Sequence, residues 1–365
     1  MPKIGLKTPL THSDSGDNLY QVNGVAYIEG NLKLIHLRIL IVLISHLQAA
    51  LRFKISRRRP GIKVPESMLP DPGVLSLRGA TRTVRVKITE FGLTPRNCGR
   101  LRQYLEELID MPVVFPGYRK EGMIFPELVH SFPGLITDYD FPVYSRTVDI
   151  SLPETLVRRL LLTEEGFSTY SRSAAFSITN KYTVRIYWLI CSWRSKGGFV
   201  ISLSNFRKIL ALGRGYDRYE NITCKILRPA AEDLEGRFPI WFLYKTYGSG
   251  EERNIVFKIR TAVSPEQMKK ESQYVWDVCF HLLHSVDANP TILSDIFSKV
   301  DYEDLRPFLS KVMDLTTYIK EVRLDARHLT DPGHDKHISD VNAYIRAALN
   351  AWFSDWRIRY QDISE

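Results

Sequence analysis

Residues 200–236 read VISLSNFRKILALGRGYDRYENITCKILRPAAEDLEG, and this stretch decides the fold. Ser204 precedes a short apolar-periodic segment that runs to Leu212, which predicts a capped helix. Gly213-Arg214-Gly215 follows as a turn, because glycine admits the backbone conformations that end a helix. Asp217 is then placed to cap a longer helix that continues to about Leu234. The stretch therefore predicts two helices joined by a tight turn.

The segments on either side complete a winged helix. Residues 181–193 predict a strongly apolar helix that closes at Gly197-Gly198, and residues 199–202 predict a short strand. Residues 240–247 and 254–260 flank a glycine-rich turn, which is typical of a hairpin. The order helix, short strand, two helices and hairpin is that of a helix-turn-helix with an attached β-ribbon.

The same order of elements recurs more loosely in the first half of the chain. Apolar residues at helical spacing over 32–53 predict a buried helix, and the Arg- and Pro-rich residues 52–73 predict an exposed connection. Alternation over 83–88 predicts a strand, and Thr94-Pro95 predicts the start of a helix that runs to about Ile109. The further elements expected are a hairpin from 112–115 and 123–129, a strand over 147–152 and a helix over 153–162.

From residue 264 onward the pattern is only helical. The helices expected there are 265–284, 291–299, 302–328 and 337–358. The predicted fold class is α+β and mainly helical, with two tandem winged-helix domains and a C-terminal all-helical domain. The predicted domain limits are 17–165, 166–263 and 264–365.

Charge is distributed unevenly along the 365 residues, whose net charge is +9. Residues 1–263 carry 38 Lys and Arg against 24 Asp and Glu, whereas residues 264–365 carry 12 against 17. A basic body with an acidic tail indicates a polyanionic partner for the body. Nucleic acid is the first candidate and an anionic membrane surface the second, and a basic face that only meets water is the alternative to both.

Composition excludes several classes of protein. With 44% hydrophobic and 25% charged residues, the chain is neither disordered nor collagenous. Its four cysteines lie far apart without a CxxC pair, which argues against a zinc ribbon and a disulfide framework. Lys33, His36 and Arg38 interrupt the most apolar window, so a membrane span is not expected. The beginning of the sequence lacks the apolar core of a signal peptide, which predicts a cytoplasmic protein.

The helix expected over 217–236 has two faces. Its predicted buried positions are Ile222, Ile226, Leu227, Ala230 and Leu234. Asn221, Lys225 and Arg228 recur on the opposite side, where long donors suit the major groove: Arg and Lys reach guanine, and Asn pairs with adenine. The alternative is a surface helix whose polar face is merely solvated, and this helix alone favours neither interpretation.

Further cations surround this helix. The candidates for phosphate contacts are Arg207, Lys208, Arg214 and Arg218. Lys245 and Arg253 flank the hairpin tip and are candidates for an adjacent groove or the DNA backbone. The preceding helix, the glycine turn and the following hairpin shift the balance toward DNA.

The earlier helix offers a second set of donors. Its candidates for DNA binding are Arg96, Asn97, Arg100 and Gln103. The end of the same helix carries three acidic residues, Glu106, Glu107 and Asp110. Their negative charge favours the interpretation that this face only meets water.

Enzyme signatures are mostly absent. The sequence has no GxxxxGK[ST], HExxH or GxSxG motif, and no His-X-His triplet of a rolling-circle nickase. His281 and His284, and likewise His334 and His337, are spaced three apart, but core and loop positions explain them better than zinc. The prediction is a protein that is not an enzyme and uses neither a metal nor a cofactor.

The chain resembles the iteron-binding plasmid replication initiators, which have two winged-helix domains. The resemblance is most specific over KYTVRIYWLI at 181–190, VISLSNFRKILAL at 200–212 and YDRYENITCKILRPAAEDLE at 216–235. The matching positions are Tyr182, Arg185, Tyr187, Leu210, Tyr216, Tyr219, Lys225, Leu227, Pro229 and Ala230. Pro229 lies inside a helix, where it deletes a hydrogen bond and kinks the axis. NLYQVNGVAYI at 18–28 is a weaker match, and residues 264–365 lie outside the family skeleton.

The resemblance implies a bacterial initiator that binds direct repeats of double-stranded DNA at a plasmid origin. Members of the family bind repeats as monomers, often repress their own promoter as dimers, help to open an AT-rich segment and recruit host replication initiator and helicase proteins. Their first winged helix usually carries dimerisation and backbone contacts, and the second reads the repeat. A homodimer is therefore one expected form of this chain.

Two alternatives stay open from the sequence. The chain is a winged-helix transcriptional regulator if its target sites lie away from a replication origin. The acidic C-terminal helices are either a protein-interaction module that exposes Trp276, Trp352 and Trp356 or a domain in which these tryptophans are core residues.

Overall fold

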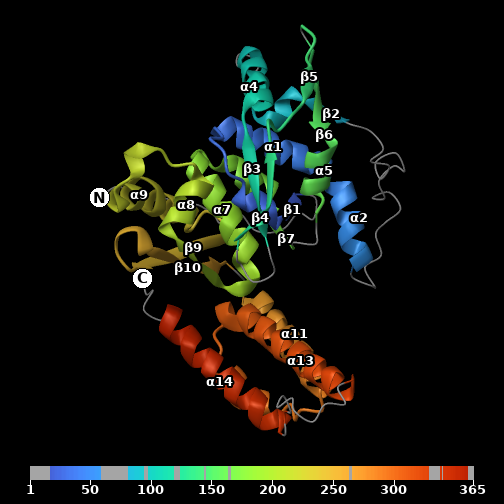
Figure 1. Cartoon of the computed structure of the whole chain (residues 1–365), viewed down its shortest axis with the longest axis vertical. Coiled ribbons are helices and arrows are strands. Elements are labelled where there is room, and N and C mark those ends of the chain that lie inside the picture. The colour runs from blue at the N-terminus through green and yellow to red at the C-terminus, as the bar shows by residue number, and fades with distance from the viewer. Residues whose placement is uncertain are drawn as a thin grey trace. The chain divides into compact units, whose positions relative to one another are not determined.

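The computed structural model (Figure 1) shows the described parts of the chain as two compact units. The residues that the structure describes are 17–58, 81–93, 98–118, 124–143, 145–162, 166–262, 265–328, 338 and 340–360. The first unit comprises Met1–Ser192, Ile201–Phe238 and Ser249–Arg253, and the second comprises Trp193–Val200, Pro239–Gly248 and Asn254–Glu365. These limits do not coincide with the expected boundaries at 165/166 and 263/264, so the three-domain division stays a prediction.

The first unit is built around a buried helix. Helix α1 (Leu34–His46) buries most of its surface, because apolar residues occupy nearly every position from Leu37 to Ile44. After Leu47 the chain continues as α2 (Gln48–Arg58). The single helix expected over 32–53 is thus two, and the prediction that residues 52–58 form a connection is wrong. Most of the predicted connection, residues 59–73, lies outside the described residues.

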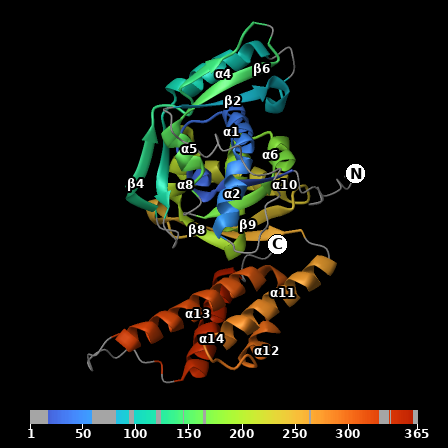
Figure 2. The same cartoon turned by 90° about the vertical axis from the view of Figure 1, so that its right-hand side faces the viewer.

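Small antiparallel sheets accompany this helix. Strand β2 (Thr81–Lys87) pairs with β6 (Thr147–Pro153), which also pairs with β5 (Asp138–Asp140). Strands β3 (Val113–Tyr118) and β4 (Ile124–Phe132) form the expected hairpin. The remaining elements here are η1 (Asn23–Tyr27), η3 (Ile88–Phe91), α4 (Cys98–Asp110) and α5 (Glu154–Leu160). Figure 2 shows α4 with β2 and β6, and the predicted helix start at Thr94-Pro95 lies outside the described residues.

Strand pairing joins the two halves that the sequence separates at residue 165. Strand β1 (Asn18–Val22) pairs antiparallel with β7 (Phe167–Ser171), and Leu19 lies opposite Tyr170. Strand β7 is followed by the short helix α6 (Arg172–Ser177) and then by α7 (Lys181–Trp193). The bounds of α7 are those that its apolar residues predict. Both expected winged helices therefore contribute residues to one compact unit.

Arg185 of α7 links this helix to the segment after η1. Its side chain is fully buried, Nη1 donates to the carbonyl of Gly30 at 2.9 Å, and Nη2 donates to the carbonyl of Ile28. Burial lowers the pKa of Arg185 to about 10, which still leaves the guanidinium charged at neutral pH. A residue that matches the initiator pattern thus has an architectural role here.

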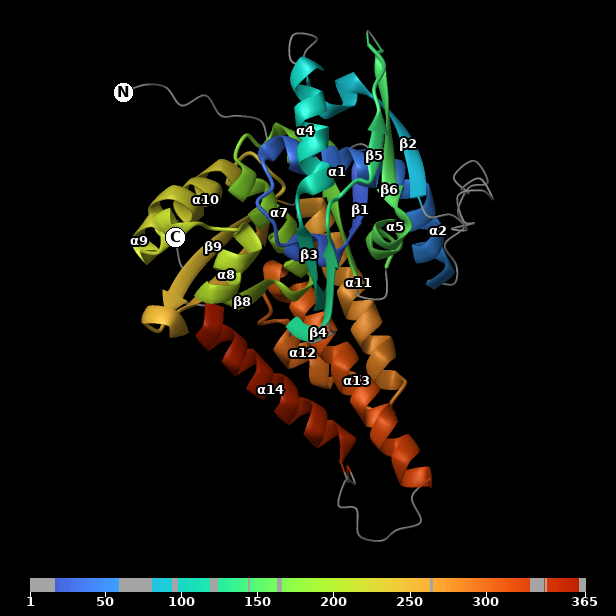
Figure 3. The same ribbon diagram turned by 45° about the horizontal axis from the view of Figure 1, so that its top comes forward.

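The elements expected for a second winged helix follow in the predicted order. They are η6 (Arg194–Lys196), β8 (Gly198–Ser202), α8 (Leu203–Leu210), η7 (Arg214–Tyr216), α9 (Tyr219–Ile222), η8 (Thr223–Leu227), α10 (Arg228–Leu234), β9 (Ile240–Tyr247), η9 (Gly250–Glu252) and β10 (Asn254–Thr261). The three strands form one sheet in the order β8-β10-β9. Figure 3 shows α9 and α10 as one continuous helical ribbon.

Two predicted helix caps are wrong. The hydroxyl of Ser202, rather than Ser204, accepts the N–H of Asn205 at 3.2 Å and caps α8. Helix α9 has Arg218 at its N-cap without a side-chain cap bond, so Asp217 does not cap it. In the first case the helix begins earlier because Leu203 is buried and must belong to its apolar face.

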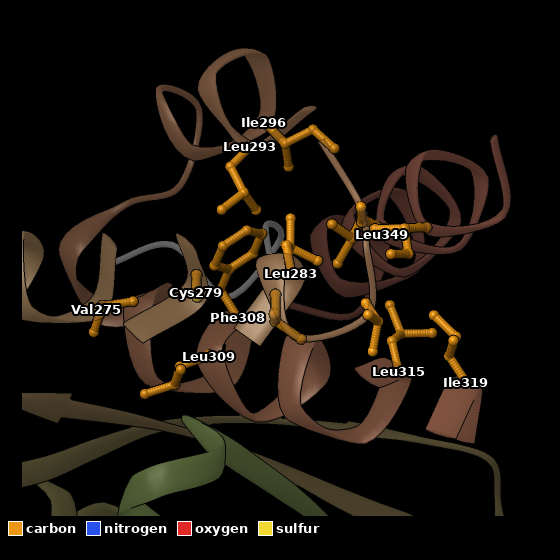
Figure 4. Close-up of a cluster of buried hydrophobic side chains, with 14 of the residues drawn as sticks. Val275, Cys279, Leu283, Leu293, Ile296, Phe308, Leu309, Leu315, Ile319 and Leu349 are labelled. Atoms are coloured by element: carbon orange, nitrogen blue, oxygen red, sulfur yellow. The ribbon is translucent and has the colours of Figure 1, made fainter. Parts of the chain in front are cut away.

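The C-terminal part of the second unit is helical, as expected. Its elements are α11 (Pro265–His284), α12 (Ile292–Phe297), η10 (Tyr302–Asp304), α13 (Leu305–His328) and α14 (Val341–Tyr360). Cys279, Leu283, Phe308 and Leu349 lie in their shared core (Figure 4). Trp276 and Trp352 pack against that core and Trp356 packs against Val256. None of the helices in the described ranges combines the length with the apolar composition that a bilayer span requires.

Candidate nucleic-acid interface

Helix α8 and the turn after it are held by backbone and apolar contacts. Leu203, Phe206, Ile209 and Leu210 are buried, whereas Lys208 points to solvent. The helix ends at Leu210, the next residue Ala211 has a left-handed φ of 49°, and the N–H of Leu212 donates to the carbonyl of Arg207 at 3.0 Å. The chain is thereby turned sharply from α8 toward α9.

The side chain of Arg207 stabilises the turn between α8 and α9. Its Nη2 donates to the carbonyls of Tyr216 and Asp217, and its side chain is half-buried. The ring of Tyr216 in turn meets the ring of Tyr182 edge-on at 5.7 Å. Burial, together with a hydrogen bond between the two hydroxyls, raises the pKa of Tyr182 to about 12. Arg207, a predicted phosphate contact, is therefore engaged in holding the turn between the two helices.

The helix from Tyr219 to Leu234 is interrupted by a wider turn. Residues Thr223–Leu227 form a π-helical turn in which the N–H of Arg228 donates to the carbonyl of Thr223, five residues back. Pro229 has no N–H and its ring crowds the carbonyl four residues before it, that of Lys225. The disturbance expected from Pro229 thus takes the form of a π turn, placed directly before it.

The two faces of this helix are those that the sequence predicts. The buried residues are Ile222, Ile226, Leu227, Ala230 and Leu234. Lys225 and Arg228 are exposed, whereas Asn221 is half-buried and its Nδ2 donates to the carbonyl of Gly215 at 3.0 Å. The structure therefore presents two of the three predicted base contacts to solvent and uses one amide hydrogen of the third to hold the turn.

Further cations lie on the same part of the chain. Lys208, Arg214 and Arg218 are exposed, and exposed Asp217 and Glu220 lie among them in the sequence. Because cations outnumber carboxylates over 207–228, this stretch offers a net positive surface.

Arg253 lies at the end of the hairpin tip. Its guanidinium carbon lies over the ring of Tyr219, 4.2 Å from the ring centroid, and its backbone carbonyl accepts the N–H of Leu203 at 2.8 Å. The tip is thereby tied to the starts of both α8 and α9. Lys245 belongs to the other unit, where it is half-buried on β9 opposite Val256 of β10.

The earlier helix, α4, is less suited to DNA. Arg100 and Gln103 are exposed, but Gln103 Nε2 donates to Glu107 Oε1 at 3.1 Å. Glu107 also pairs with Lys33 Nζ at 2.7 Å and with His36 Nε2 at 3.0 Å. The hydrogen bond from Lys33 lowers the pKa of Glu107, so this part of α4 carries a firmly ionised carboxylate. Arg96 and Asn97 lie outside the described residues.

Within the described ranges, no group of three or more His, Cys, Asp or Glu side chains is arranged to hold a metal ion. His281 and His284 are exposed on α11, so the expectation of core positions for them is wrong. Their helix buries Val275, Cys279 and Leu283 instead. His334 and His337 lie outside the described residues.

The sequence gives no separate signal for Tyr219 as a partner of Arg253. The two residues are 34 positions apart, and only the return of the hairpin tip to α9 brings them together. A tyrosine at the first position of an amphipathic helix is ordinary on its own. The pair becomes recognisable only in three dimensions.

Comparison with known proteins gives structural matches of low identity. No family model matches the chain. The chain is similar to the Pi initiator protein, solved in complex with iteron DNA, with 11% identity and a TM-score of 0.47 over 69% of this chain and 100% of that one. It is also similar to domains 2 and 3 of RctB, with 10% identity and a TM-score of 0.33 over 72% of this chain and 97% of that one.

Proposed function

We propose that this chain binds double-stranded DNA at repeated sites and initiates replication of a plasmid from its origin. The observation that carries the proposal is the outward face of α9–α10, where Lys225 and Arg228 are exposed after a helix and a tight turn. Arg214 and Arg218 are exposed at the entrance of the same helix.

This arrangement suits a duplex chemically. A helix fits the major groove of B-form DNA, where lysine and arginine donate to O6 and N7 of guanine. Cations at the entrance of such a helix contact phosphates and fix its register, as in other helix-turn-helix proteins. We therefore assign base contacts to Lys225 and Arg228, and phosphate contacts to Lys208, Arg214 and Arg218.

Salt dependence tests the binding itself. The affinity of the full chain for a labelled duplex should fall steeply as salt rises, because each neutralised phosphate releases counterions. Gln substitution of Arg214 or Arg218 should reduce the slope of log K against log salt by about 0.9 for each lost phosphate contact. The matched control is Arg346→Gln, which changes an exposed arginine on α14 and should leave the slope unchanged. A slope near zero for the unmodified chain rejects DNA binding.

Footprinting tests the assignment of base contacts. On an array of the preferred repeat, Lys225→Gln or Arg228→Gln should cost about 1–3 kcal/mol and relax the preference at one base pair. Unchanged protection by both variants rejects the assignment and leaves the phosphate contacts standing.

Replication initiation is the finer part of the proposal, and it draws on the family resemblance. Opening of an AT-rich segment, recruitment of host replication initiator and helicase proteins, and autoregulation through a homodimer belong to it, in the bacterial cytoplasm. Deleting the gene from a plasmid that carries it should abolish maintenance of that plasmid. If maintenance persists and only transcription near the bound repeats changes, the chain is a transcriptional regulator with the same fold.

The proposal is also that of a protein without catalysis. A strand-nicking assay with Mg²⁺ on supercoiled plasmid containing the bound repeats should give no nicked product. Nicking that is lost on heat inactivation of the chain contradicts this part.

A further inference from the structure

The tip of the hairpin is fixed from two directions at Arg253. The backbone is held because the carbonyl of Arg253 accepts the N–H of Leu203, the first residue of α8, at 2.8 Å. The side chain is held because its guanidinium carbon lies 4.2 Å from the centroid of the Tyr219 ring. Tyr219 is the first residue of α9, so the stack joins the tip to the start of the proposed recognition helix.

Arg253 is half-buried, and it meets Tyr219 through a cation–π contact rather than a hydrogen bond. An arginine over an aromatic ring is attracted through its flat face, well within the 6 Å range of a cation–π contact. The five N–H groups of an arginine lie in the plane of its guanidinium, in a fork that matches a phosphate. Stacking therefore orients Arg253 without using the donors that a phosphate needs.

We infer that Tyr219 is a positioning residue that presents Arg253 to a phosphate of the bound duplex. The inference rests on the proposed DNA binding and extends it to the hairpin tip. An arginine side chain has many rotamers, and a contact formed by an already oriented one loses less conformational freedom. The ring supplies this orientation, and its hydroxyl is not needed for it.

A double-mutant cycle in duplex affinity separates positioning from a merely structural effect. Tyr219→Leu should weaken binding about two- to fivefold at fixed salt, as expected from the strength of an exposed cation–π contact. Tyr219→Phe keeps the ring and should bind like the unmodified chain. Arg253→Gln should lower the salt slope by about 0.9, and Tyr219→Leu added to it should have no further effect.

Two outcomes of the cycle overturn the inference. One is an equal loss from Tyr219→Leu with and without Arg253, which would place the effect in α9 itself. The other is a loss in Tyr219→Phe as large as that in Tyr219→Leu, which would assign the effect to the hydroxyl. Thermal unfolding of each variant shows whether the fold is kept.

A second measurement needs no DNA and keeps the two proposals distinguishable. In the free protein, the Nε–Hε resonance of Arg253 should be shifted upfield by the ring current of Tyr219. The shift should persist in Tyr219→Phe and vanish in Tyr219→Leu. An unshifted resonance in the unmodified chain overturns the positioning role even if the chain binds DNA. If the resonance is shifted but the chain shows no salt-dependent duplex binding, the proposed function is rejected. The contact of Arg253 with a phosphate is then rejected as well.

Discussion

Substituting Arg185 by methionine should destabilise the first unit strongly. The side chain is 1% exposed, and it donates to the carbonyls of Ile28 and Gly30, which lie in a segment more than 150 residues away. Methionine keeps most of the apolar stem and creates little cavity, so the change isolates the two hydrogen bonds.

The magnitude follows from these bonds and from the burial of the charge. A hydrogen bond from a charged group contributes about 1.5–3 kcal/mol, and each buried carbonyl left without its donor costs about 1–3 kcal/mol. Removing a buried guanidinium also relieves its desolvation penalty, which offsets part of the loss. A net decrease of roughly 2–4 kcal/mol in the free energy of unfolding is expected for Arg185→Met.

Urea unfolding followed by tryptophan fluorescence and far-ultraviolet circular dichroism measures this decrease. Arg146→Met is the matched control, since Arg146 is exposed in the same unit, and it should change the free energy by no more than about 0.5 kcal/mol. If Arg185→Met is as stable as the control, the buried guanidinium does not hold α7 to the segment after η1. The reasoning about this unit would then be refuted.

Three further changes probe other parts of the molecule. Asn221→Ala removes the hydrogen bond to the carbonyl of Gly215 and should lower the free energy of unfolding, measured in urea, by about 1 kcal/mol; an unchanged value would show that this bond does not hold the turn. Burial lowers the pKa of His36 beside Glu107, so the unfolded chain takes up the proton first. Stability should therefore be full above pH 6.5 and fall at lower pH, by at most about 1.4 kcal/mol per pH unit, and His36→Gln should flatten this dependence in pH-resolved thermal unfolding. Leu283→Ala opens a cavity in the core of the C-terminal helices and should cost about 2–5 kcal/mol in their unfolding transition, and a smaller cost would mean that the core collapses around the gap.

The spacing of apolar residues along the sequence was sufficient to predict the helices of the candidate interface. The apolar periodicity of 181–193 predicts α7 with its observed bounds, and the spacing of Ile222, Ile226 and Leu227 identifies the buried face of α9–α10. Burial of one face leaves the opposite face to solvent, which is why Lys225 and Arg228 were predicted correctly as exposed residues.

The features that could not be predicted from the sequence depend on contacts between segments that lie far apart along the chain. Arg207 has the same charge as Arg214, but only the fold shows that carbonyls of the following turn engage it. Arg185 within an apolar helix gives no hint of Ile28 and Gly30, because its partners lie far along the chain. The pairing of β1 with β7 likewise ties together residues that the order of elements along the chain assigns to separate domains.

Selection of bound duplexes from a random pool tests the central claim most directly. The full chain should enrich one defined motif, and a variant carrying both Lys225→Gln and Arg228→Gln should lose that enrichment while still binding DNA weakly through its phosphate contacts. Recovery of no common motif by the unmodified chain, or of the same motif at the same enrichment by the variant, would contradict a sequence-reading role for the outward face of α9–α10.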